Sequence, residues 1–90
     1  MNELDYRTFR VIVVDDEPDQ LEAFRLNFRR DFDLRLANSG AEALEMLKAQ
    51  DAAVLLTDQR MPNMTGVELL VQAKEARPDT VRIVGTAFKD

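Results

Sequence analysis

Residues 52–66 read Ala-Ala-Val-Leu-Leu-Thr-Asp-Gln-Arg-Met-Pro-Asn-Met-Thr-Gly, an apolar run that leads into a polar loop. The run from Ala52 to Thr57 is continuous rather than alternating, which is typical of a strand buried on both faces of a sheet. Asp58 follows directly, so it lies at the carboxyl end of the predicted strand. In open α/β sheets ligands bind at this edge, because the loops diverge there around a crevice. Asp58 is therefore the first candidate for a functional residue.

The composition limits the classes of function. The chain has 90 residues, of which 46% are apolar and 32% charged, and this indicates one globular domain with a thin core. A net charge of −5, from 17 acidic and 12 basic residues, predicts no direct contact with nucleic acid or an anionic membrane. Cysteine and histidine are both absent, which excludes disulfides, thiolate metal sites and the commonest general base. Carboxylates and hydroxyls remain for chemistry.

The lengths of the apolar runs and the composition of residues 1–9 indicate where in the cell the protein is found. No apolar run approaches the ~20 residues that a membrane span needs. Residues 1–9 are polar with mixed charge, unlike a signal peptide. We therefore expect residues 1–9 to be an N-terminal leader and the protein to be cytoplasmic.

Strand and helix patterns alternate along the rest of the chain. Apolar and β-branched runs predict strands over 10–14, 32–37, 52–57 and 81–85. Helical spacing and capping signals predict helices over 18–30, from Ser39 to Gln50, and from Thr65 until Pro78 ends the third. The expected buried stripes are Leu21, Phe24, Leu26 and Phe28 in the first helix, Leu44 and Leu47 in the second, and Val67, Leu70 and Val71 in the third. This order predicts an α/β fold, a doubly wound parallel sheet with helices on both faces.

Three carboxylates are expected to meet at one edge of this sheet. Asp15 and Asp16 end the first strand and Asp58 ends the third, so they converge if these two strands are neighbours. Carboxylates at close quarters repel one another unless a cation screens them. Hard oxygen ligands with room for water suit Mg²⁺, which also assists phosphoryl transfer to a carboxylate. Thr86, after the fourth strand, is placed to hydrogen-bond the resulting phosphate, or is simply a polar residue at a strand end.

Three stretches carry a family resemblance: Val13-Val14-Asp15-Asp16-Glu17-Pro18, Asp58-x-x-Met61-Pro62-x-x-x-Gly66 and Gly85-Thr86-Ala87. In this order and spacing they resemble the receiver domains of two-component response regulators, over residues 10–88. Gln59-Arg60 is similar to the corresponding pair in receivers of hydrogenase-gene activators. The resemblance implies a flavodoxin-like sheet with strand order 2-1-3-4.

The resemblance also implies a role for each matched residue. Asp58 corresponds to the phosphoacceptor, which takes a phosphoryl group from a sensor histidine kinase and so switches an output domain or effector protein. Asp16 corresponds to the direct Mg²⁺ ligand beside Asp58, and Asp15 to the acid that reaches the metal through water. The backbone carbonyl of Arg60 matches the third protein ligand. Thr86, followed by Ala87, matches the phosphate switch. No enzyme activity is implied beyond slow self-catalysed phosphorylation and dephosphorylation.

The sequence also departs from the family pattern. A full receiver continues through a fourth helix, a fifth strand with an essential lysine and a fifth helix, whereas this sequence ends at Lys89-Asp90. Residues 10–90 are thus expected to form a partial receiver, and Lys89 is not assigned the role of that lysine. The fourth strand is expected to be an exposed apolar edge, and the face of the first helix with Phe24 and Phe28 is expected to be partly open. This predicts self-association through the fourth strand, the first helix or both, or else that the sequence is a truncated portion of a longer folded chain.

Two other functions stay open. One is an interaction module that keeps the fold but signals by binding alone, which the missing lysine favours. The other is an Mg²⁺-dependent aspartyl phosphohydrolase. Such enzymes carry Asp-x-Asp on the first strand, whereas here the acids are adjacent and the candidate nucleophile follows the third strand.

Overall fold

The computed structural model describes residues 8–85, which form four strands and three helices in alternation. The elements are β1 (Arg10–Val14), α1 (Pro18–Phe28), β2 (Asp33–Ala37), α2 (Gly40–Ala49), β3 (Val54–Thr57), α3 (Gly66–Ala76) and β4 (Val81–Val84). The predicted order of elements is confirmed. Among these residues, no helix has both the length and the apolar character that crossing a membrane requires.

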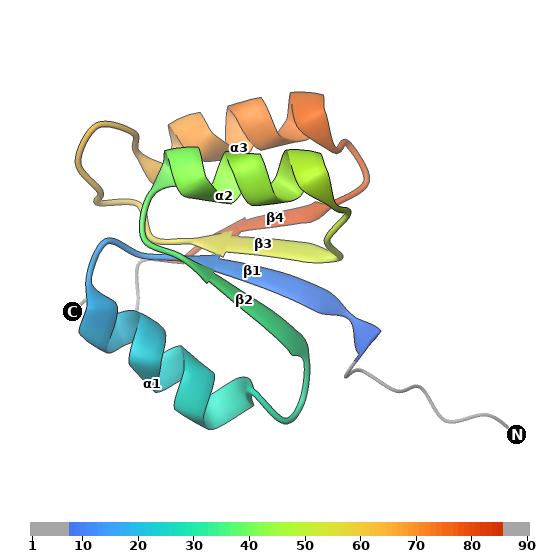
Figure 1. Ribbon diagram of the computed structural model, residues 1–90. Coiled ribbons are helices and arrows are strands. Elements are labelled where there is room, and N and C mark those ends of the chain that lie inside the picture. The colour runs from blue at the N-terminus through green and yellow to red at the C-terminus, as the bar shows by residue number, and fades with distance from the viewer. Residues whose placement is uncertain (1–7, 86–90) are drawn as a thin grey trace, which may run out of the picture.

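The strands form one parallel sheet in the order β2-β1-β3-β4, as predicted. β1 is central, since its last residue, Val14, pairs with Ala37 of β2 on one side and with Thr57 of β3 on the other. Figure 1 shows α1 on one face of the sheet and α2 with α3 on the opposite face. The first and third strands are therefore neighbours, which was the condition for the three carboxylates to meet.

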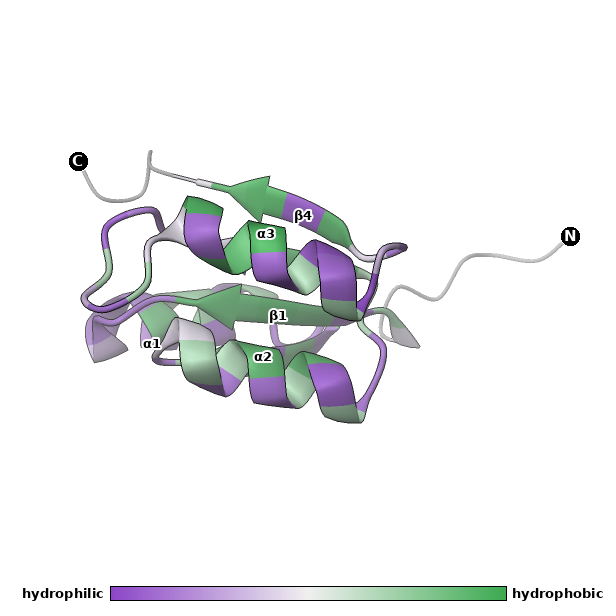
Figure 2. Ribbon diagram, turned by 90° about the horizontal axis from the view of Figure 1, so that it is seen from above, coloured by the Kyte–Doolittle hydropathy of each residue, from purple (hydrophilic) through white to green (hydrophobic). Residues whose placement is uncertain are grey.

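The main core lies between the sheet and the two helices α2 and α3. Ile12, Leu55, Leu47 and Leu69 are fully buried there. Burying a leucine or isoleucine side chain contributes on the order of 2 kcal/mol each, so this layer supplies much of the stability. In Figure 2 β1 is hydrophobic along most of its length, whereas α2 and α3 carry both hydrophobic and hydrophilic bands.

The α1 face of the sheet is only half covered. α1 packs against β1 and β2, and a groove of about 200 Å³ between α1 and the sheet is lined by apolar side chains of α1 and of three strands. Val54 and Leu56 of β3 are half-buried, whereas Leu55 and Thr57 are buried. The prediction that this strand is buried on both faces is therefore wrong for the described residues, because no described helix packs over β3 on the α1 side.

Two predicted helix stripes need correction. In α1, Leu21 is buried but Leu26 is 59% exposed, because a residue five positions further along a helix points to a different side. Phe28, the last residue of α1, is also exposed. In α3, Val67 and Val71 are more than half exposed, and the buried residues are instead Gly66, Leu69 and Ala73. The α2 prediction is confirmed, because Leu44 and Leu47 are both buried.

The element ends differ slightly from the prediction. α1 ends at Phe28, with Arg29 as its C-cap, two residues before the predicted end. β3 begins at Val54 rather than Ala52. α3 begins with the predicted capping box: Thr65 Oγ1 accepts the Glu68 N–H at 3.1 Å, and Glu68 Oε1 accepts the Thr65 N–H at 2.9 Å.

Candidate phosphoacceptor and metal site

Strand register brings the acidic residues together. The backbone N–H of Asp58 donates to the Val14 carbonyl at 3.0 Å, and the N–H of Asp15 donates to the Ala37 carbonyl at 3.1 Å. Asp15 and Asp58 are thus the first residues beyond two paired strands, at the same carboxyl-terminal edge. Parallel strands that end together direct the residues that follow them into a common crevice.

Asp15, Asp16 and Asp58 form one cluster, as the sequence predicted. One carboxylate oxygen from each lies within 4.8 Å of the others. Asp15 is 0% and Asp58 1% exposed, and Asp16 is half-buried. Asp15 Oδ1 accepts the backbone N–H of Glu17 at 2.9 Å, which fixes the orientation of this carboxylate.

The cluster fits a hard divalent cation. Ionised carboxylates this close repel one another, and a bound cation would offset that repulsion. Asp16 Oδ1 is buried and has no hydrogen-bond partner among residues 8–85. A buried polar atom without a partner costs free energy, so this oxygen is an available ligand position. Carboxylate oxygens are the ligands that Mg²⁺ prefers, and the donor set therefore suits that ion.

The loop from β3 to α3 is held close to Asp58. A Cβ atom added to Gly66 would lie 2.5 Å from the Asp58 carbonyl oxygen, so glycine is needed for this approach. Thr57 Oγ1 donates to the same carbonyl oxygen at 2.9 Å. Asn63 has a φ of +73°, a left-handed conformation that asparagine tolerates and that turns the loop back toward α3.

The structure places some predicted site residues and not others. The Asp15–Asp16–Asp58 cluster is assembled. Arg60 lies in the β3–α3 loop with an exposed side chain. Thr86 and Ala87 lie outside the described residues.

Sequence reasoning missed the contact of Gln59 with α3. Its side chain accepts a hydrogen bond from the backbone N–H of Val67, eight positions further along the chain. The capping patterns that can be recognised in a sequence span about three residues. The contact depends on how the loop folds back, so no sequence signal was present to find it.

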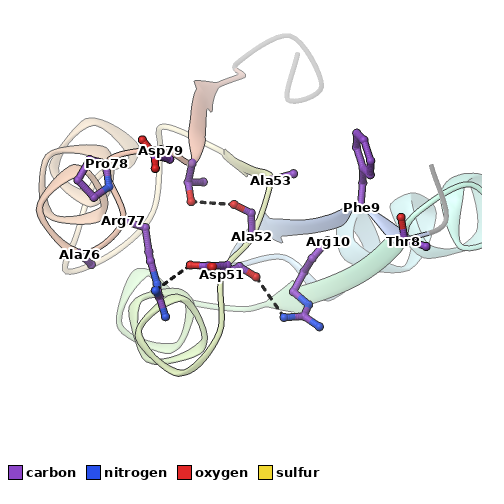
Figure 3. A pocket seen from close by; sticks show the side chains of 11 residues that line it. Thr8, Phe9, Arg10, Asp51, Ala52, Ala53, Ala76, Arg77, Pro78 and Asp79 are labelled. Atoms are coloured by element: carbon purple, nitrogen blue, oxygen red, sulfur yellow. Dashed lines mark hydrogen bonds and ion pairs between the residues drawn. The ribbon is translucent and has the colours of Figure 1, made fainter. Parts of the chain in front are cut away.

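A cavity lies at the other end of the sheet from the acidic cluster, where β1, β3 and β4 begin. Its volume is about 690 Å³, and Figure 3 shows its lining residues. Its polar groups bond to one another: Arg77 Nη1 and Asp51 Oδ1 lie 2.7 Å apart, Arg10 Nη1 donates to the Asp51 carbonyl at 3.1 Å, and Thr80 Oγ1 donates to the Ala52 carbonyl at 2.8 Å. These contacts tie the end of α2 to the starts of the strands. The cavity has no convergent charge like that of the three carboxylates.

Comparison with known proteins decides the family. Residues 11–90 match the response regulator receiver domain. The chain belongs to this family. Receiver domains of response regulators are signalling domains and generally not enzymes, so the membership does not favour the phosphohydrolase.

Individual relatives agree with the family. The hydrogenase transcriptional regulatory protein HoxA of Cupriavidus necator is 41% identical over 80 residues, which cover 89% of this receiver and 17% of HoxA. The response regulator protein PilR of Pseudomonas aeruginosa is 32% identical over 80 residues, covering 88% of this receiver and 18% of PilR. The receiver thus spans about a sixth of the length of these curated relatives.

A solved structure confirms the fold. The crystal structure of a response regulator receiver protein from Pseudomonas putida has a TM-score of 0.80 and 30% sequence identity, and the match covers 87% of this chain and 67% of that chain. The flavodoxin-like order 2-1-3-4 inferred from the sequence is therefore correct for this receiver.

Proposed function

We propose that Asp58 of this receiver accepts a phosphoryl group from the phosphohistidine of a sensor kinase. The observation that carries the proposal is the position of Asp58, which ends β3 within 4.8 Å of the Asp15 and Asp16 carboxylates. In the transfer an Asp58 carboxylate oxygen forms a bond to phosphorus, while the bond from phosphorus to the histidine nitrogen breaks. The electron pair stays on that nitrogen.

The residues around Asp58 would hold Mg²⁺. Asp16 and Asp58 supply carboxylate oxygens, Arg60 its backbone carbonyl, and Asp15 acts through a water molecule. When bound, Mg²⁺ neutralises charge on the phosphoryl oxygens during transfer. Burial of Asp15 and Asp58 strengthens these electrostatic interactions, because the effective dielectric constant is lower than in water.

A response to phosphorylation also needs a group that senses the phosphate. The family resemblance assigns this role to the hydroxyl of Thr86, with Ala87 beside it. Thr86 comes two residues after the end of β4, whose parallel pairing with β3 places its carboxyl end at the same edge as Asp58. This arrangement supports the assignment.

The partners follow from the class of protein. We propose a sensor histidine kinase as phosphodonor and an output domain or effector protein as target, with the receiver acting in the cytoplasm. HoxA of Cupriavidus necator is by name a transcriptional regulator, which supports transcription as the regulated process. The comparisons do not favour a module that signals by binding alone, and phosphorylation distinguishes the two functions.

The test is incubation with acetyl phosphate and Mg²⁺, followed by intact-mass measurement. We expect a mass increase of one phosphoryl group at low yield, because the 90 residues do not include the fifth-strand lysine of the family pattern, and we expect it to disappear in Asp58→Asn. Asp79→Asn is the matched control, because Asp79 is an exposed acid at the other edge of the sheet. An increase that persists in Asp58→Asn at full yield, or no increase in the unchanged chain, would contradict the proposal.

A further inference from the structure

Gln59, the residue directly after Asp58, is bonded through both of its oxygens to the first turn of α3. Its backbone carbonyl accepts the N–H of Gly66 at 3.1 Å. Its side-chain Oε1 accepts the N–H of Val67 at 2.9 Å. The first N–H groups of a helix have no partner within the helix, so they need acceptors from elsewhere. Gln59 supplies two of these acceptors, although it lies seven residues before Gly66 and eight residues before Val67.

These bonds complete the cap of α3. The next N–H, from Glu68, is accepted by Thr65 Oγ1 at 3.1 Å. The first three residues of α3 are therefore capped by two residues from different ends of the same loop: Gln59 through its backbone carbonyl and its side chain, and Thr65 through its side chain. Because Gln59 and Thr65 both bond the first turn of α3, the loop between them is held at its two ends.

The contact between Gln59 and α3 is close. A Cβ atom at Gly66 would lie 3.0 Å from Gln59 Oε1 and 3.0 Å from Gln59 Cα. Gln59 is half-buried in this contact. Its side chain therefore packs against the start of α3, and its peptide is fixed between Asp58 and that helix.

We propose that Gln59 is a positioning residue for the metal site. By tying its own peptide to α3, it fixes the direction in which the chain leaves Asp58, and so the position of the next carbonyl, that of Arg60. This inference rests on the proposed function, in which the Arg60 carbonyl is a Mg²⁺ ligand. Mg²⁺ demands near-ideal octahedral geometry, so a loosely held carbonyl binds it less well.

The inference requires an acceptor atom at the end of a side chain of this length. Gln59→Met keeps the length and apolar stem but removes the acceptor. Gln59→Asn keeps the amide but shortens the side chain by one methylene. Gln59→Glu keeps both the length and an acceptor, and a negative charge near a helix N-terminus is favourable.

The primary measurement is Mg²⁺ affinity by titration calorimetry of the purified chain. We expect Gln59→Met and Gln59→Asn each to weaken binding about five- to tenfold, since a net hydrogen bond is of this order. Gln59→Glu is expected to bind at least as well as the unchanged chain. Gln50→Met, at an exposed position after α2, is the matched control and is expected to leave the affinity unchanged.

A second readout follows the bond itself. Hydrogen exchange at the Val67 amide is expected to become about tenfold faster in Gln59→Met and to stay slow in Gln59→Glu. If Gln59→Met does not fold, Gln59→Asn carries the test. A purely structural role would lower the denaturation midpoint but would leave the Mg²⁺ affinity of the folded chain unchanged.

The possible outcomes distinguish a failure of the inference about Gln59 from a failure of the proposed metal site. If Asp16→Ala abolishes Mg²⁺ binding while both Gln59→Met and Gln59→Asn bind within twofold of the unchanged chain, the inference about Gln59 is wrong and the proposed site stands. If the unchanged chain binds no Mg²⁺, the proposed metal site fails and the inference fails with it. Weaker binding in the two variants that lose the contact, with recovery in Gln59→Glu, supports the inference.

Discussion

Val14 and Thr57 are directly paired in the parallel ladder between β1 and β3. Because the two strands end at this pair, the next residues, Asp15 and Asp58, enter the same crevice, and Asp58 donates its N–H to the Val14 carbonyl. Strand register therefore determines the spacing of the acidic cluster. Side-chain substitutions in the cluster should change its charge and ligands without moving the strands.

Asp16→Ala is predicted to weaken Mg²⁺ binding more than Asp15→Ala. Asp16 is half-buried with a buried oxygen that has no partner among residues 8–85, whereas Asp15 Oδ1 already accepts the Glu17 N–H. We expect a loss of at least tenfold for Asp16→Ala and a smaller loss for Asp15→Ala, in calorimetric titrations under identical conditions. Equal losses would mean that the acids attract the ion as a diffuse charge cluster.

Gly66→Ala is predicted to destabilise the fold by about 1–3 kcal/mol, because the added Cβ would meet backbone atoms of Asp58 and Gln59 that cannot move easily. Gly40→Ala is a matched control, since the atoms nearest to its Cβ would be those of the flexible Met64 side chain, with Sδ at 2.6 Å. The free energy of unfolding from urea denaturation measures both. A loss for Gly40→Ala as large as that for Gly66→Ala would show that close approach to the Asp58 peptide is not what selects glycine.

Asp33 gives a pH-dependent contribution to stability. Its hydrogen bond from Arg35, at 2.9 Å, lowers its pKa, as does the bond from Arg10 at 3.1 Å, against an opposing effect of burial. The stabilisation is therefore complete above the ordinary carboxyl pKa of about 3.9 and is lost as pH falls through the lower pKa of the folded state. Asp33→Asn should cost about 0.5–1 kcal/mol at pH 7, and this cost should shrink as the pH falls through the lower pKa of the folded state.

Urea denaturation of the two chains across this pH range measures the difference. Glu45→Gln, at an exposed position on α2, tests for general effects of removing an acid. If the free energies of unfolding of the unchanged chain and Asp33→Asn still differ as much below the ordinary carboxyl pKa as at pH 7, the ionised Asp33 makes no such contribution to stability.

The sheet edge at β4 predicts self-association of the 90-residue chain. Val81 and Ile83 are 55% and 43% exposed, and no described strand pairs with the outer edge of β4. Val81 and Gly85 direct their N–H groups toward β3, so those of Arg82 and Val84 face outward. A second copy can pair antiparallel with this edge about a two-fold axis.

Light scattering over a concentration series tests this prediction. Ile83→Lys should lower the average mass toward that of a monomer, whereas Val71→Lys, at a more exposed site on α3, should not. A mass equal to that of one chain at high concentration would show that the edge does not pair.

The element order and the acidic cluster could be predicted because both depend on local patterns. Each strand is a short apolar run, and the acids follow two of these runs directly. The sheet order was inferred from the family resemblance. The buried faces were harder: Val67 and Val71 look like a core stripe, but the residues of α3 that face the sheet are Leu69 and Ala73. Which of several apolar faces is covered depends on the neighbouring elements.

The contacts of the β3–α3 loop could not be predicted. Gln59 reaches Val67 only because Gly66 lets the loop approach the Asp58 peptide. Such a contact depends on the path of a loop, and the sequence contains no periodicity that encodes it. Thr86 and Ala87 lie outside the described residues, so their role as the phosphate switch stays a prediction.

The most direct test of the account locates the phosphoryl group on the chain. After reaction with acetyl phosphate and Mg²⁺, borohydride reduces an aspartyl phosphate to the corresponding alcohol, and peptide mass spectrometry identifies the changed residue. The account predicts one modified position, Asp58, with Asp15 and Asp16 unmodified. Modification of Asp16 or Asp15 instead, at a yield unaffected by Asp58→Asn, would contradict the claim that Asp58 is the phosphoacceptor.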